Sequence, residues 1–191
     1  MNSFFSLLFR QKYILRWGLM RNITPESLAE HTAEVAVIAH ALAVIGNTLY
    51  GKHYDPDRAA AAALFHDAPE VLTGDLPTPI KYFSPEMKNG YRAIEEHAVG
   101  TLLSKLPPEL RDAYEPLLAP GGTDPDTHRL VKTADKLCAY LKCLTEEAGG
   151  NPEFRSARRA IEAELNAYDS PELRYFRDNL LEAFTLTIDE M

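Results

Sequence analysis

Proline placement limits what this chain can fold into more than any other feature of its sequence. Six prolines each follow a residue whose side chain can cap a helix, and an acidic residue follows each proline. Proline at the first helical position loses no useful N–H group, and the preceding oxygen satisfies a free backbone donor. The acidic residue suits the positive end of the helix dipole. The six pairs are Thr24-Pro25, Asp55-Pro56, Ser84-Pro85, Asp124-Pro125, Asn151-Pro152 and Ser170-Pro171.

The segments that follow these pairs contain no convincing strand-like alternation of apolar and polar residues. We therefore expect an all-α chain in which residues 1–191 form one domain, since this length suits a sizeable core. Residues 152–191 are expected to extend the same core. Helices are expected at about 26–46, 56–68, 85–105, 125–148, 152–167 and 171–183, and also at 3–15 and 108–118.

The composition is that of an ordinary globular protein, with 46% hydrophobic and 25% charged residues and a formal net charge of −8. The negative charge argues against binding to nucleic-acid polymers, which requires a basic face to replace counterions. A small phosphate ester needs only a local cluster of cations, so the net charge does not argue against such a ligand.

Two cysteines, Cys138 and Cys143, lie five residues apart on one expected helix, which is a poor geometry for a disulfide. We expect buried, reduced thiols, which fit a cytoplasmic protein. No apolar run is expected to approach the ~20 residues of a membrane span. The short apolar stretch at residues 4–9 is expected to pack on the domain or on a partner as an amphipathic helix, and not to anchor the chain in a membrane.

Four residues on three expected helices, within about 26–148, form the strongest chemical pattern in the chain. His31 lies on an apolar stripe, His66-Asp67 ends an alanine-rich helix, and Asp135 lies at the edge of an apolar arc. Each feature alone has an ordinary explanation: a core histidine, a capping pair, or a salt bridge to a neighbouring lysine. In this order, two imidazoles and two carboxylates are typical of a site for one divalent metal ion.

Four protein ligands leave two open positions on an octahedral ion, and catalysis needs open positions for water and substrate. This favours cobalt, manganese or iron, while nickel, zinc, copper and magnesium stay open as alternatives. A two-metal site would need further histidine and aspartate ligands, and His40, His53 and His97 show no such pattern.

Several blocks of the sequence resemble known metal phosphohydrolases. Glu30-His31, His66-Asp67 and Thr133-Ala134-Asp135-Lys136-Leu137 are similar to the HD-domain superfamily. Residues 16–22, 70–81 and 137–144 closely resemble bacterial 5′-deoxynucleotidases of the YfbR type. The resemblance implies an all-α HD-domain helical bundle. It also implies a cytoplasmic homodimer that hydrolyses deoxyribonucleoside 5′-monophosphates to deoxynucleosides and phosphate.

The residues around the expected metal fit the needs of phosphomonoester hydrolysis. Glu70 is the candidate acid or water-positioning base, and Pro69 is expected to make it open a new short turn. Arg16 can hold phosphate through its planar fork, and Trp17, the only tryptophan, can wall the sugar. The resemblance implies that Arg16 and Trp17 orient the phosphate and sense the sugar.

The resemblance implies further substrate contacts. Asp75 would contact a sugar hydroxyl or the attacking water, and the metal ligands His31 and Asp135 would also contact substrate. By position, the loop Pro120-Gly121-Gly122-Thr123 resembles a substrate-contacting loop of the family. Its small residues stand where bulkier polar residues are expected.

Three charged residues have two readings each: Glu30 either orients His31 or faces solvent, and Lys81 and Arg21 either steer phosphate or are ordinary surface charges. Two functional alternatives also stay open. One is another HD-superfamily nucleotide phosphohydrolase, which would release tripolyphosphate from deoxynucleoside triphosphates or pyrophosphate from alarmones. The other is a catalytically silent nucleotide-binding module, although such a module need not retain Glu70 and an intact ligand set.

Overall fold

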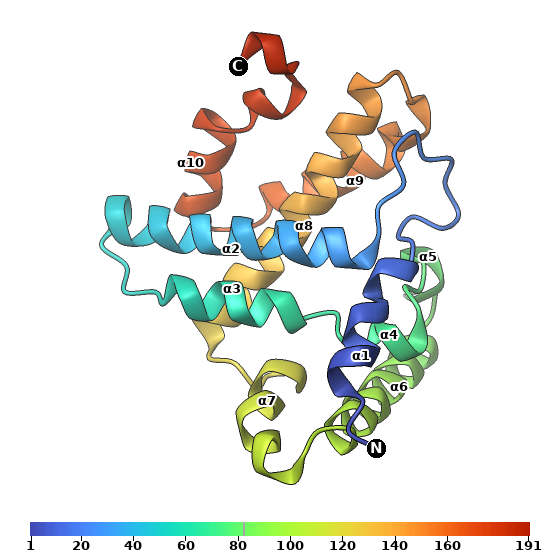
Figure 1. The fold of residues 1–191 in the computed structure, drawn as a ribbon. Helices are drawn as coiled ribbons and strands as arrows, with labels where there is room; N and C mark the ends of the chain where they lie inside the picture. The colour runs from blue at the N-terminus through green and yellow to red at the C-terminus, as the bar shows by residue number, and fades with distance from the viewer. Residues whose placement is uncertain (82) are drawn as a thin grey trace.

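A computed structural model of the chain describes residues 1–81 and 83–191, and it consists of helices joined by short loops (Figure 1). Within these residues there is no β-strand, so the expected all-α class is confirmed. The α-helices are α1 (Phe4–Leu8), α2 (Leu28–Tyr50), α3 (Pro56–Phe65), α4 (Glu70–Thr73), α5 (Thr78–Lys81), α6 (Pro85–Ser104), α7 (Arg111–Leu118), α8 (Pro125–Ala148), α9 (Arg155–Asn166) and α10 (Pro171–Asn179).

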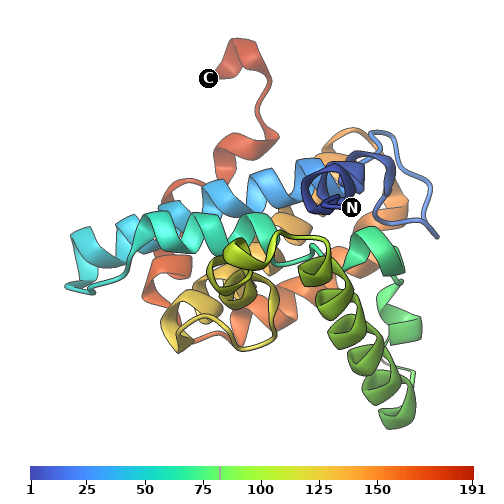
Figure 2. The same ribbon diagram turned by 60° about the horizontal axis from the view of Figure 1, so that its bottom comes forward.

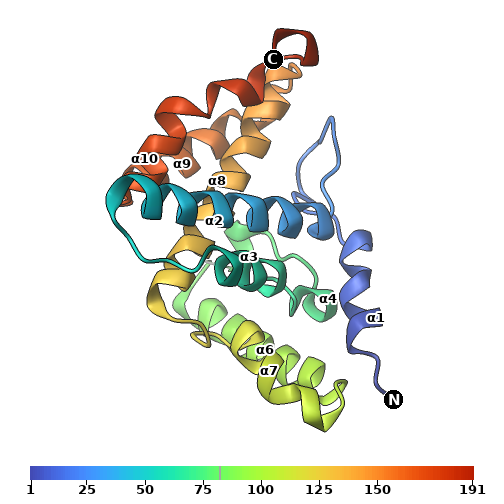
Figure 3. The ribbon, with the colours of Figure 1, turned by 60° about the vertical axis from the view of Figure 1, so that its left-hand side comes forward.

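The centre of the fold is a three-helix packing of α2, α3 and α8. α2 and α3 lie side by side, and α8 crosses behind them (Figure 1). Alanines make up much of the buried face of α3, and their small side chains allow the helices to approach closely. α9 packs on α8, and α10 packs on α2 (Figure 3). The expectation that the C-terminal helices extend this core is consistent with these contacts.

A second apolar cluster lies on the other side of α3 and is formed mainly by α1, α6 and α7. α6 projects away from the layer that contains α2 and α3 (Figure 2). Ala63 belongs to the central cluster and Ala68 to the second one. The segment that joins α3 to α4, which contains His66 and Asp67, therefore runs between the two clusters.

Five of the six expected helix caps are confirmed. In each case the side-chain oxygen accepts a hydrogen bond from a backbone N–H of the first turn, and proline occupies one of the first two helical positions. The capping residues are Asp55, Ser84, Asp124, Asn151 and Ser170.

The sixth expected start, at Thr24-Pro25, is wrong. α2 begins at Leu28, where Ser27 and Glu30 form a capping box: each side chain accepts a hydrogen bond from the other's backbone N–H. Glu26 therefore lies before the helix and does not belong to its first turn.

The residues just before α2 are held in a short extended pairing. Leu15 and Ser27 form an isolated antiparallel bridge, and the N–H of Arg16 donates to the carbonyl of Glu26 at 2.9 Å. The N–H of Leu28 donates to the carbonyl of Ile14 at 2.8 Å. These bonds satisfy backbone groups that a longer helix would have used, so the helix starts later than expected.

Other expected helices differ at their ends. The helix expected at 26–46 continues to Tyr50, the one at 56–68 ends at Phe65, and the one at 171–183 ends at Asn179. Three expected helices contain 3₁₀ segments: Phe9–Tyr13, Pro108–Leu110 and Pro152–Phe154. Two more 3₁₀ segments, Glu182–Thr185 and Ile188–Glu190, follow α10 and were not expected.

α2 is long and apolar enough to cross a membrane when judged by length and composition alone, with a mean hydropathy of 1.5. The expectation that no apolar run approaches that length is therefore wrong for this helix. Half of its most apolar window is buried inside the structure, and α2 contacts α3, α8 and α10. The apolar character of α2 fits its place at the centre of the packing.

The expectation of buried, unpaired thiols at Cys138 and Cys143 is confirmed.

Candidate metal centre

Three of the four expected metal ligands lie together between the two apolar clusters. His31 comes from the first turns of α2, His66 caps the C-terminus of α3, and Asp67 follows it. One ligand atom from each of these residues lies within 4.8 Å of the others. Asp67 Oδ2 is 3.0 Å from His66 Nε2 and 3.8 Å from His31 Nε2. The end of α3 thus allows adjacent residues to converge on one point.

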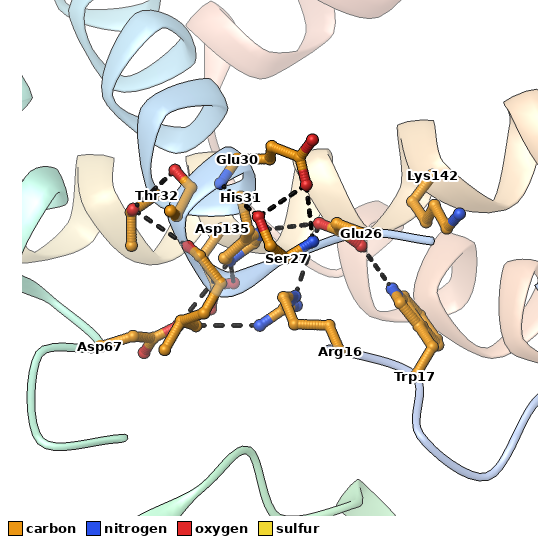
Figure 4. A network of polar contacts seen from close by, with 12 residues as sticks. Arg16, Trp17, Glu26, Ser27, Glu30, His31, Thr32, Asp67, Asp135 and Lys142 are labelled. Carbon is orange, nitrogen blue, oxygen red and sulfur yellow. Dashed lines mark hydrogen bonds and ion pairs between the residues drawn. The ribbon is translucent and has the colours of Figure 1, made fainter. Parts of the chain in front are cut away.

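Asp135 approaches the same point from α8. Its Oδ1 lies 3.2 Å from His31 Nε2. The alternative for Asp135 was a salt bridge to a neighbouring lysine, but the adjacent Lys136 pairs with Glu164 at 2.7 Å. Two imidazole nitrogens and two carboxylates from α2, α8 and the end of α3 therefore surround one position, as Figure 4 shows for His31, Asp67 and Asp135.

The two histidine rings are oriented by their other nitrogens. His66 Nδ1 lies 2.6 Å from the carbonyl oxygen of Ala63, which can only accept, so Nδ1 carries the proton. His66 Nε2 then has a free lone pair; it is buried, lies 3.0 Å from Asp67 Oδ2 and makes no hydrogen bond within residues 1–81 and 83–191. His31 Nδ1 faces Glu26 Oε1 at 3.2 Å, which leaves His31 Nε2 directed at Asp135 and Asp67. A nitrogen held in this way fits the requirements of metal ligation.

The electrostatics of the cluster favour ionised carboxylates. Burial alone would raise the pKa of Asp67, but the neighbouring His66 lowers it below the usual range. Burial likewise opposes ionisation of Asp135, and its hydrogen bond to His31 more than offsets this, so its pKa is also lowered. Burial lowers the pKa of His31, but its hydrogen bonds to Asp135 and Glu26 outweigh burial and raise it to about 8. Anionic carboxylates are the form that binds a divalent ion.

Glu70 is the first residue of the short helix α4, and Pro69 precedes it, so the expected new turn is confirmed. The Glu70 side chain is buried, and among the residues that the structure describes its Oε2 has no hydrogen-bond partner. Burial, together with the nearby charges of Asp67 and Asp75, raises the pKa of Glu70 to about 9. A buried carboxyl group of this kind, beside a potential metal site, is typical of a residue that handles protons.

Arg16 and Trp17 lie on one side of the cluster (Figure 4). Arg16 Nη1 is 3.7 Å from Asp67 Oδ2, and Arg16 Nε is 3.5 Å from Glu26 Oε1. The indole N–H of Trp17 donates to Glu26 Oε2 at 2.7 Å, and its ring lies 5.3 Å from that of Phe154. The backbone of Trp17 has φ of 58°, a left-handed conformation that is strained for a bulky residue.

Glu26 is the main residue that the sequence analysis misplaced. Assigned to a helix start, it is instead buried between His31, Arg16 and Trp17. The available signal was the pattern Ser27-x-x-Glu30, which marks a helix start at residue 28 and places Glu26 outside it. Glu30 itself is exposed and caps the helix, so it does not orient His31.

A cavity of about 650 Å³ opens beside the cluster. Its wall contains Asp67 and Asp135 together with four other residues singled out from the sequence: Arg16, Trp17, Glu70 and Asp75. Its volume lies in the range of small-molecule sites. A further part of the wall was not expected from the sequence and comes from α9 and α8, with Ala157, Ala160, Ile161, Glu164 and Ala139.

The loop 120–123 lines a different, smaller cavity of about 200 Å³, together with His66 and Asp67. Pro120, Gly121 and Thr123 contribute to its wall. Gly122 packs instead against Pro116, where an added Cβ would lie 2.5 Å from the Pro116 carbonyl oxygen. The structure therefore places this loop near His66 and Asp67, but not on the wall that holds Arg16 and Trp17.

The two candidate steering cations have different environments. Lys81 lines both cavities, and its ammonium group pairs with Glu95 at 2.9 Å. Arg21 is exposed and pairs with Glu153 at 2.6 Å. Lys132 also lines both cavities and was not considered as a steering cation from the sequence.

Comparison with known proteins adds to this geometry. The model of the family described as 5′-deoxynucleotidase YfbR-like matches residues 3–184. The chain is 48% identical to a 5′-deoxynucleotidase of Vibrio cholerae over 190 residues, covering all of this chain and 98% of the relative. It is 47% identical to the 5′-deoxynucleotidase YfbR of Escherichia coli over 190 residues, covering all of this chain and 96% of the relative.

Among solved structures, an HD-domain phosphohydrolase from Listeria innocua has a similar fold, with a TM-score of 0.84 at 24% identity. The match covers 95% of this chain and 88% of that one. The expected HD-domain bundle is thereby confirmed at the level of the fold.

Proposed function

Since the chain belongs to the family of YfbR-like 5′-deoxynucleotidases, we propose that it hydrolyses deoxyribonucleoside 5′-monophosphates to deoxynucleosides and inorganic phosphate with a bound divalent metal ion. The observation that carries the proposal is the buried Nε2 of His66, which lies 3.0 Å from Asp67 Oδ2 and makes no hydrogen bond within the described part of the chain. Asp67 also lines the cavity that contains Arg16, Trp17 and Glu70.

The donor set fits the metal that the proposal needs. His31, His66, Asp67 and Asp135 would hold the ion, and they leave two positions of an octahedral ion open. Cobalt, manganese or iron suits two imidazoles and two carboxylates best, with nickel, zinc, copper and magnesium as alternatives. When bound, such an ion acidifies a coordinated water and neutralises phosphate oxygens.

Glu70 is proposed to handle the proton of the reaction. Its carboxyl group is buried, and its high pKa favours the protonated form that can donate to the leaving 5′-oxygen. Asp75 lies on the same cavity wall and is proposed to contact a sugar hydroxyl or the attacking water.

Arg16 is proposed to orient the phosphate and Trp17 to exclude ribose. The guanidinium group lies 3.7 Å from Asp67 and faces the larger cavity, where it can meet a phosphate bound next to the ligands. Trp17 is fixed by Glu26 and Phe154, so its indole can form a rigid wall beside the sugar. Asp135 lines the same cavity and would contact the substrate there. His31 was expected to do so too, but it is fully buried and lines neither cavity, so its proposed role is limited to holding the metal. The loop 120–123 would reach the substrate only from the side of the smaller cavity.

We also propose that the protein is a cytoplasmic, single-domain homodimer that binds neither a membrane nor nucleic-acid polymers. The outer face of α2 carries two exposed valines one heptad apart, Val37 and Val44, which suit a partner surface. Free thiols at Cys138 and Cys143 support a reducing compartment. The net charge of −8 supports the absence of polymer binding. Sedimentation equilibrium of the purified protein tests the dimer directly.

The test of function is a phosphate-release screen. Protein stripped with a chelator is supplied with one divalent metal at a time and offered deoxyribo- and ribonucleoside 5′-monophosphates, deoxynucleoside triphosphates and alarmones. Release of inorganic phosphate from dAMP is expected. Release of tripolyphosphate or pyrophosphate would instead identify another HD-type activity. Nucleotide binding without any product under all metals would identify a silent module.

A further inference from the structure

We propose that Glu26 is a positioning residue that couples the metal ligand His31 to the substrate-facing indole of Trp17. One carboxylate oxygen lies 3.2 Å from His31 Nδ1, and the other accepts the indole N–H of Trp17 at 2.7 Å (Figure 4). The link between the metal site and the cavity wall is therefore a single side chain. The part of this inference that concerns sugar selection rests on the proposed function, whereas the part that concerns metal binding does not.

The environment of Glu26 explains why a carboxylate is needed there. Its side chain is 8% exposed, and a buried charge is costly unless partners compensate it. The compensation comes from the Trp17 N–H, which donates to Oε2, and from two charged groups beside Oε1: His31 at 3.2 Å and the Arg16 guanidinium at 3.5 Å. A glutamine at this position would lose the negative charge that faces His31 and Arg16, and it would offer only one accepting oxygen.

A carboxylate behind a metal-ligating histidine has a known physical effect. It fixes the tautomer and ring orientation and makes the other nitrogen a stronger ligand, and removing such a partner typically weakens metal binding about 10–100-fold. Glu26 Oε1 is placed to act on His31 in this way. Among the described residues, the ring of His66 is oriented instead by a backbone carbonyl, that of Ala63.

The conformation of Trp17 also depends on Glu26. A φ of 58° costs a bulky residue of the order of 1–3 kcal/mol, so contacts elsewhere must hold it. The hydrogen bond to Glu26 Oε2 and the ring contact with Phe154 supply such contacts. Glu26 also accepts the backbone N–H of Arg16 through its carbonyl. Loss of the carboxylate removes the only polar contact on the indole that the structure describes.

This arrangement has a direct spectroscopic test, because Trp17 is the only tryptophan in the chain. Zn²⁺ is titrated into metal-free protein while tryptophan emission is recorded, and the dissociation constant is measured independently by competition with a chelator. In the parent, ordering of His31 by the ion is expected to change the Glu26–Trp17 contact. The emission shift should therefore saturate with the same dissociation constant as the competition.

The informative variant is Glu26→Gln. Zn²⁺ affinity is expected to fall about 10–100-fold, and the zinc-dependent emission shift is expected to disappear. The matched control is Glu30→Gln, which makes the same chemical change four residues later. The Glu30 carboxylate is exposed, and among the described residues it bonds only to Ser27, so this variant is expected to bind Zn²⁺ and shift emission as the parent does.

If circular dichroism shows that Glu26→Gln does not fold, Glu26→Asp takes its place. The shorter side chain retains the charge but withdraws it from His31 and Trp17, so the same two losses are expected.

A second readout uses metal-saturated enzyme. The ratio of kcat/KM for dAMP to that for AMP is expected to fall in Glu26→Gln and to stay at the parent value in Glu30→Gln. Zn²⁺ affinity within about twofold of the parent in the folded Glu26 variant, or an equal loss in Glu30→Gln, would overturn the inference. An unchanged ratio despite weakened metal binding would overturn the coupling to Trp17. A parent that binds Zn²⁺ but hydrolyses no nucleotide would refute the proposed function. The Zn²⁺ affinities and emission shifts would then still decide whether Glu26 positions His31.

Discussion

Replacement of Glu146 by glutamine should remove a large, pH-dependent part of the stability of this fold. Glu146 is a buried residue of α8 whose carboxylate accepts the backbone N–H groups of Ile23 and Thr24 at 2.9 and 3.0 Å. It also accepts from Lys142 at 2.5 Å and from Asn151 at 2.7 Å. It thus ties the loop that follows Trp17 to the core.

The magnitude follows from the pKa of the group. Burial opposes ionisation of Glu146, but the hydrogen bonds from Lys142, Ile23, Asn151 and Thr24 more than offset it and lower its pKa from 4.5 to about 2. A difference of about 2.5 pH units at about 1.4 kcal/mol per unit gives about 3.5 kcal/mol. Because the folded-state pKa is depressed, this stabilisation is fully present above the unfolded pKa and is lost as the pH falls toward the folded one.

The assay is urea unfolding followed by circular dichroism at about pH 7, pH 4.5 and pH 2.5, the window set by the two pKa values. At neutral pH, Glu146→Gln is expected to lose about 1–3 kcal/mol, because the amide NH₂ would replace one of the two accepting oxygens and face the two donors bonded to it: Lys142 and Thr24, or Asn151 and Ile23. The parent should then lose about 2.5 kcal/mol more than the variant between pH 7 and pH 2.5, because the lowest pH is still slightly above the folded-state pKa of about 2. The control is Glu147→Gln, which breaks only the Glu147–Arg158 pair and should cost about 0–1 kcal/mol. Parallel pH profiles of parent and Glu146→Gln would refute the reasoning.

Three further predictions concern the site. Chelation is expected to abolish activity, and His66→Ala with Asp67→Ala should lose metal by elemental analysis; full metal content and activity in the double variant would contradict the ligand assignment. Glu70→Ala is expected to retain the metal but to lower kcat about 10²–10⁴-fold, and an unchanged kcat would remove its proton-handling role. Trp17→Ala should lower the dAMP to AMP ratio of kcat/KM by relieving a clash with the ribose hydroxyl, whereas Arg16→Ala should depress both substrates together. An unchanged ratio in Trp17→Ala would show that a residue other than Trp17 distinguishes deoxyribose from ribose.

Local rules predicted much of the fold because its helix starts are encoded locally. A cap, a proline and an acidic residue within three positions are sufficient to mark a start, and five of six such starts were right. The exception, Thr24-Pro25, failed because the backbone before α2 bonds to residues 14–16, which are distant in sequence from residue 24. The capping box of Ser27 and Glu30 marks the start at residue 28 locally, but no local pattern shows that residues 26–28 pair with residues 14–16.

The candidate site, like the fold, was predicted in part from the sequence. The order of His31, His66-Asp67 and Asp135 along three helices was visible in the sequence, and the structure brings these residues together. The α9 wall of the larger cavity was not visible, because its alanines and isoleucine look like any helix face. The separation of loop 120–123 into a smaller cavity depends on the close packing of Gly122 against Pro116, which also has no local signature.

The strained backbone of Trp17 depends on residues that are far from it in the sequence. A left-handed tryptophan is unfavourable by itself, so no propensity scale would place it there. Its side chain is held by two contacts, the hydrogen bond to Glu26 before α2 and the ring of Phe154 after α8. The Glu146 carboxylate fixes residues 23 and 24 of the loop that follows. Together these interactions favour one orientation of the indole at the cavity wall. A wall that must reject one hydroxyl group requires this rigidity, because a movable side chain would simply yield to it.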